Sequence, residues 1–66
     1  MQIQVNGKPV ELPENATLAA LLEHLRLNGK PCATEVNAQL VPKARQEQHR
    51  LLPNDKVEIV TLVGGG

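Results

Sequence analysis

The residues of this chain whose types and spacing could do chemistry lie at its C-terminal end, where Val63 precedes Gly64, Gly65 and Gly66. Glycine has no Cβ, so this run of backbone can take almost any conformation and pass through a channel too narrow for side chains. Extended at about 3.3–3.6 Å per residue, the segment 62–66 would carry its carboxylate about 15 Å beyond the domain. We therefore expect the α-carboxylate of Gly66 to react inside another protein's active site. A frayed end is the alternative, since disorder concentrates at termini.

Other reactive side chains are few. Cys32 is the only cysteine, which excludes an internal disulfide framework and a cysteine-rich zinc site. Its thiolate could relay sulfur, but no basic residue stands directly beside it, and a small buried hydrophobe is the favoured interpretation. His24 and His49 lack partners at metal-ligand spacing, so we interpret both as solvated surface residues. The sequence thus predicts no catalytic residue and no metal site.

Composition limits the classes of function that the chain could have. It has 66 residues, enough for one domain but too few to favour an internal catalytic cleft. Seven basic residues balance seven acidic ones and no aromatic residue is present, which disfavours nucleic acid and anionic membranes as partners. No apolar stretch approaches a membrane span, and Met1 leads directly into strand-like sequence. We expect a cytoplasmic protein.

The elements that must position the glycine tail begin with a hairpin. Residues 1–5 alternate, with Ile3 and Val5 on one face, which is the pattern of a half-buried strand. Asn6-Gly7 then predicts a type I′ turn, in which both central residues have φ > 0. The chain would return antiparallel to the first strand through residues 8–12.

A helix is predicted next, because four leucines at helical spacing form one apolar stripe. They are Leu18, Leu21, Leu22 and Leu25. Thr17 or Asn15 could cap the start of this helix. Asn28-Gly29 is the predicted stop, with Pro31 preventing the helix from resuming.

The second half predicts short strands and turns. Residues 32–36 form a strand, 37–38 a tight turn, and 39–41 a short return strand that ends at a proline. Residues 43–50 are polar and predict an irregular or one-turn helical loop. Residues 56–63 are the longest and most β-rich segment.

This order of elements predicts an α+β fold, the β-grasp (ubiquitin-like) arrangement of a mixed four- to five-stranded sheet with one main helix across one face. We assign residues 1–63 to the domain and 64–66 to a flexible tail. The last strand should lie parallel to the first, in the middle of the sheet. Val60 and Leu62 would then be exposed beside the tail and, with Val63, form a partner-docking site; the alternative is that other side chains cover them.

Several short motifs, taken in order and at this spacing, resemble the ThiS family of sulfur carrier proteins of thiamine biosynthesis. They are Glu35-Val36-Asn37, Val41-Pro42-Lys43, Pro53-Asn54-Asp55, Lys56-Val57-Glu58-Ile59-Val60 and Val63-Gly64-Gly65-Gly66. The likeness spans the whole chain. It departs from the family at Gln46, where many members have an aromatic residue, and at Asn54, where glycine is usual.

The resemblance implies that the chain is a carrier and not an enzyme, and that it holds no cofactor of its own. An adenylating, E1-like activating enzyme would bind ATP and Mg²⁺ and join Gly66 to AMP. A persulfide sulfur, supplied through a cysteine desulfurase, would then convert Gly66 into a thiocarboxylate that is passed to thiazole synthase. Gly64 and Gly65 would thread the tail. The alternatives are a ubiquitin-like protein modifier, a sulfur carrier of another pathway such as molybdopterin synthesis, and a plain interaction module with a disordered end.

Overall fold

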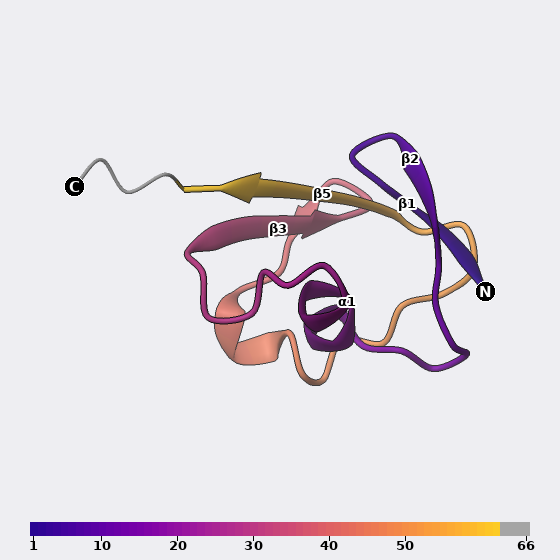
Figure 1. The fold of residues 1–66 in the computed structure, drawn as a ribbon, viewed down its shortest axis with the longest axis horizontal. Coiled ribbons are helices and arrows are strands. Elements are labelled where there is room, and N and C mark those ends of the chain that lie inside the picture. Colours follow the sequence, from indigo (N-terminus) through magenta and orange to yellow (C-terminus); the bar gives the residue numbers. More distant parts are fainter. Residues whose placement is uncertain (63–66) are drawn as a thin grey trace.

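The computed structural model describes residues 1–62, which form a mixed five-stranded sheet of order β2-β1-β5-β3-β4 with a helix across one face (Figure 1). The strands are β1 (Gln2–Val5), β2 (Lys8–Glu11), β3 (Cys32–Val36), β4 (Gln39–Leu40) and β5 (Lys56–Thr61). The helix is α1 (Leu18–His24), and a 3₁₀ turn, η1 (Lys43–Arg45), lies in the predicted polar loop. The architecture matches the prediction; the predicted boundary between domain and tail lies outside the described residues.

The β1–β2 hairpin turns as the sequence predicts. Asn6 and Gly7 have φ of 50° and 81°, the left-handed values that a type I′ turn requires at both central positions. Val5 and Lys8 pair on either side of this turn. The tight turn fixes the register, so Ile3 and Val5 face the helix and are buried.

Strand β5 occupies the centre of the sheet, as predicted. It runs parallel to β1, with Val5 opposite Val57, and antiparallel to β3, with Thr34 opposite Ile59. Val57 and Ile59 are 1% and 7% exposed and pack in the aliphatic core. The strand that leads to the glycine tail is therefore anchored by neighbours on both sides.

Helix α1 begins where the sequence indicates. Of the two predicted capping residues, Thr17 is the cap, and its Oγ1 accepts a hydrogen bond of 3.1 Å from the N–H of Ala20. Leu18, Leu21 and Leu22 are buried against the sheet. No helix within residues 1–62 is long and apolar enough to cross a membrane.

The predicted stop of this helix at Asn28-Gly29 is wrong. The helix ends at His24, and Arg26 takes the left-handed conformation with φ of 60°. The N–H of Arg26 bonds to the carbonyl of Glu23, and the N–H of Leu27 bonds to the carbonyl of Leu22 at 2.7 Å. These two bonds make a Schellman motif around a residue that is not glycine. Leu27 packs against the core, and we attribute the early stop to this contact.

The loop after β4 contributes a buried polar side chain that the sequence did not predict. Gln46 is 9% exposed, and its Nε2 donates to Thr34 Oγ1 at 3.2 Å. Thr34 Oγ1 in turn donates to the carbonyl of Val41 at 3.2 Å. Gln46 thus ties its loop to the inner face of β3. It is a packing residue and not a member of a solvated loop.

Asp55 joins two turns to the start of β5. Its Oδ2 accepts from the N–H of Leu52 at 2.8 Å, and its Oδ1 accepts from Asn37 Nδ2 at 3.0 Å. Asn37 Oδ1 accepts from the N–H of Lys56 at 3.0 Å. Asn54 has φ of 70°, which asparagine tolerates better than most residues.

Candidate functional site

The candidate site is the C-terminal end of β5, from which the chain continues into the glycine tail. Figure 1 shows β5 running past the β1–β2 hairpin, so that its end is flanked by β3 alone. Val60 is 60% exposed and Leu62 is 54% exposed. The prediction that both side chains are exposed is confirmed. The third predicted docking residue, Val63, lies outside the described residues, as do the predicted threading and attachment residues of the tail, Gly64, Gly65 and Gly66.

Val60 belongs to an aliphatic surface on the face of the sheet that α1 does not cover. It lies opposite Ala33 of β3, and Leu40 of β4 lies opposite Glu35. Leu40 is 66% exposed. We call Ala33, Leu40 and Val60 the outer-face patch. Leu40 was not predicted to lie on this surface, although its alternation with Val41, which is buried, could have placed it on this face.

Two carboxylates border the outer-face patch. Glu35 and Glu58 lie directly opposite each other on β3 and β5, a placement in which like charges repel. Neither makes an ion pair with another of the residues that the structure describes. The end of the sheet therefore combines aliphatic side chains with a locally negative border.

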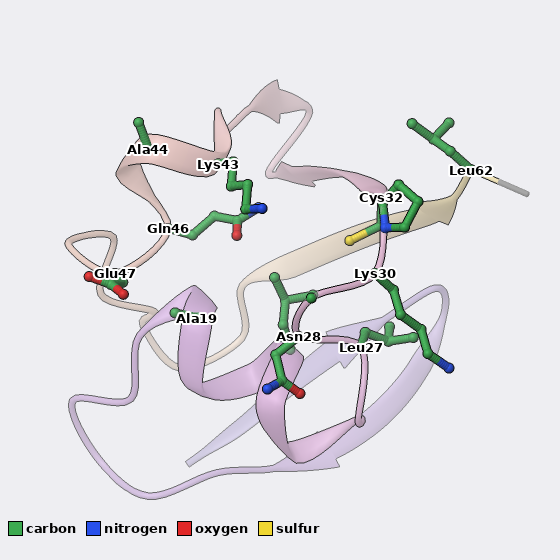
Figure 2. A pocket seen from close by; sticks show the side chains of 13 residues that line it. Ala19, Leu27, Asn28, Lys30, Cys32, Lys43, Ala44, Gln46, Glu47 and Leu62 are labelled. Carbon is green, nitrogen blue, oxygen red and sulfur yellow. The ribbon is translucent and has the colours of Figure 1, made fainter. Parts of the chain in front are cut away.

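A groove of about 740 Å³ lies on the other side of this end of the sheet (Figure 2). Its walls come from α1, the loop before β3, the η1 loop, and Leu62. Leu62 borders this groove at the end of β5, and Figure 2 shows its side chain pointing away from α1. The exposed surface at the end of β5 therefore reaches both sides of the sheet.

Cys32 also lines the groove, and Figure 2 shows its sulfur in view there. It is half-buried and packs against the core, so it is largely the small hydrophobe that the sequence predicts. His24 is exposed and His49 is half-buried. Within residues 1–62, no three potential metal-ligating side chains come together.

The chain is similar both to a family model and to individual known proteins. The model of the ThiS family matches residues 3–66. The sulfur carrier protein ThiS of Bacillus subtilis is 35% identical over 65 residues, which cover 97% of this chain and 98% of that protein. An uncharacterized protein of Porphyra purpurea, ycf40, is 39% identical over 66 residues, with coverage of 100% of this chain and 93% of that one.

Two further likenesses concern an enzyme and a solved structure. The thiazole synthase of Paramagnetospirillum magneticum is 35% identical over 66 residues, which are all of this chain but only 20% of that polypeptide. The crystal structure of the thiamine biosynthesis protein ThiS of Geobacter metallireducens superposes with a TM-score of 0.84 at 26% identity, and covers 100% of both chains. The β-grasp prediction is thereby confirmed.

Proposed function

The chain belongs to the ThiS family, and from this membership we propose that it is a sulfur carrier of thiamine biosynthesis whose C-terminal glycine is converted to a thiocarboxylate. The observation that carries the proposal is the family match, which runs from residue 3 through the glycine tail to residue 66. The structure adds support, because the strand that leads to this tail is anchored in the sheet, and Val60 and Leu62 are exposed at its end.

The proposed chemistry takes place on the main-chain carboxylate of Gly66. A carboxylate is a poor acyl donor because its leaving group would be oxide, so activation comes first. The carboxylate attacks the α-phosphorus of ATP, pyrophosphate leaves, and Gly66 becomes a mixed anhydride with AMP. The terminal sulfur of a persulfide then attacks the glycine carbonyl and AMP leaves. A second thiol of the donor system breaks the S–S bond, which leaves the thiocarboxylate on Gly66 and a disulfide on the donor.

In this proposal the carrier supplies reach and recognition, and its partners supply the catalytic groups. ATP and Mg²⁺ belong to an E1-like activating enzyme, so the carrier needs no cofactor and catalyses no step. Gly64 and Gly65 thread through a narrow channel because they present no Cβ to its walls. Val60, Leu62 and Val63 contact the partner beside the entrance to that channel.

Thiazole synthase is the proposed sulfur acceptor. Support comes from the Paramagnetospirillum relative, since a region similar to this whole chain forms one fifth of a polypeptide named thiazole synthase. A carrier and an acceptor that occur in one polypeptide are suited to act on each other. A cysteine desulfurase is the proposed origin of the persulfide, and the cytoplasm is the proposed location.

Intact-mass analysis tests the proposed function. The wild-type chain is incubated with an E1-like enzyme, ATP, Mg²⁺ and a persulfide donor, and we expect a gain that corresponds to one oxygen-to-sulfur exchange. Deletion of Gly66 or the Gly65→Val substitution should abolish the gain and leave the circular dichroism of the domain unchanged. Covalent adducts on other proteins would indicate a protein modifier instead. Normal activation of either tail variant would rule out the tail as the reacting group.

A further inference from the structure

Strand β5 is a central strand at its start and an edge strand at its end. The carbonyl of Val57 accepts from the N–H of Asn6 at 2.9 Å, on the side of β1. The N–H of Leu62 donates to the carbonyl of Pro31 at 2.9 Å, on the side of β3. Since the hydrogen-bonding groups of a strand point alternately to its two sides, the N–H and C=O of Thr61 point to the side of β1.

The side chain of Asn6 marks the point at which β5 loses its neighbour on that side. Its Nδ2 donates to the carbonyl of Ile59 at 3.1 Å, and its Oδ1 accepts from the N–H of Ile59 at 2.9 Å. The amide thus stands in for one more residue of β1, which ends at Val5. Thr61 lies beyond it, and its N–H and C=O have no hydrogen-bond partner among residues 1–62.

The two outer edges of the sheet, β2 and β4, are protected against the addition of another strand, whereas the edge of β5 at Thr61 is not. In β2, Val10 pairs with Ile3, and the N–H of Leu12 donates to the carbonyl of Met1, so Pro9 occupies a position whose nitrogen faces outward. Proline at such a position denies an incoming strand a donor. On the opposite edge, β4 has only two residues. No proline, lysine or bulge interrupts the open edge at Thr61.

We propose that this open edge of β5 receives an extended main-chain segment of the activating enzyme, which adds as a strand beside Thr61. The proposal rests on the proposed function and specifies how the carrier is held. Strand addition recognises the backbone and leaves specificity to side chains on either face. Val60 adjoins Thr61 on the same strand end, so main-chain pairing and aliphatic docking form one continuous interface. Pairing there would extend the sheet toward the tail and direct its path.

Thr61→Pro tests the proposal, because it removes the outward N–H and places the proline ring at the open edge. The position makes no hydrogen bond within residues 1–62, so the domain should keep its thermal midpoint. Thr61→Val is the matched control, since it keeps the N–H and the branched shape. The proline variant would lose one main-chain hydrogen bond to the partner, and its ring would block the approach of a strand. Its kcat/KM for adenylation should therefore fall roughly tenfold or more. The valine variant should match the wild type.

Amide hydrogen exchange of the wild-type chain gives a second readout that needs no variant. The N–H of Thr61 should exchange rapidly in the free chain and become protected in the complex with the activating enzyme, while the N–H of Ile59 is protected in both. The proposal is overturned if the proline variant is adenylated at the wild-type rate, if the valine variant loses as much as the proline one, or if the amide stays unprotected in the complex. Protection in the isolated chain with dimerisation would assign the edge to a second copy. If the wild type gains no AMP, the proposed function fails and the inference with it.

Discussion

Val60→Ala should weaken docking to the activating enzyme without weakening the fold. Burying a whole valine side chain is worth about 1.5–3 kcal/mol. Val60 is 60% exposed, so docking can bury a part worth about 1–2 kcal/mol, and alanine retains only the Cβ of that part. We expect a loss of about 1 kcal/mol, which is about fivefold in affinity.

Steady-state adenylation kinetics with the carrier as the varied substrate measure this loss. Because Val60 is proposed to contact the partner and not the reacting carboxylate, the substitution should raise KM about fivefold and leave kcat unchanged. Leu52→Ala is the matched control, since Leu52 is 64% exposed but lies before the start of β5, at the other end of the strand. The reasoning fails if Val60→Ala behaves as wild type, if it lowers kcat at constant KM, or if Leu52→Ala causes the same loss.

Two further predictions concern stability, and urea denaturation measures both. Asp55→Ala removes the acceptor of hydrogen bonds from Leu52 and Asn37 and should lower the free energy of unfolding by about 2–3 kcal/mol. The control, Glu14→Ala, removes an exposed carboxylate and should change the free energy of unfolding little. Equal losses in the two variants would contradict the role assigned to Asp55. Ala38→Gly should stabilise the domain by about 0.5–1 kcal/mol, because Ala38 has φ of 69° and glycine relieves that strain. This gain should outweigh the added entropy of the unfolded chain. A lower urea midpoint would show that the turn is unstrained.

The parts of the fold that local sequence determines were predictable. Asn6-Gly7 specifies a turn by its own conformational preference, and Thr17 specifies a helix start because its hydroxyl reaches the first turn. The helix end was not predictable in the same way. Arg26 takes a conformation that its type disfavours, and the contact of Leu27 with the core involves residues distant in the sequence. Tertiary packing here overrides the glycine signal at Asn28-Gly29.

In the candidate site, too, the features set by local sequence were predictable and those that depend on distant residues were not. The exposure of Val60 follows from strand alternation and from the absence of a second covering layer, both of which the sequence indicates. The burial of Gln46 does not, because its partner Thr34 lies on a strand 12 residues away and a polar side chain in a polar segment gives no local sign of burial. Leu40 was missed because a strand of two residues offers only one sign of its face, the alternation with buried Val41.

The central position of β5 matters for the proposed function, in which the reactive group would lie beyond the end of this strand. An edge strand would be held from one side only and could fray, and the direction in which the chain leaves the domain would vary with it. Here β1 pairs with β5 as far as Val57, the Asn6 side chain holds Ile59 on the same side, and β3 pairs with the strand through Thr61. The side chains of Val57 and Ile59 lie in the core. Because side chains alternate between faces, we expect substitutions at these two positions to lower stability, and substitutions at Val60 to weaken the proposed contact with a partner. In the proposed function, alternate residues of this one strand would therefore serve the core and the contact with a partner.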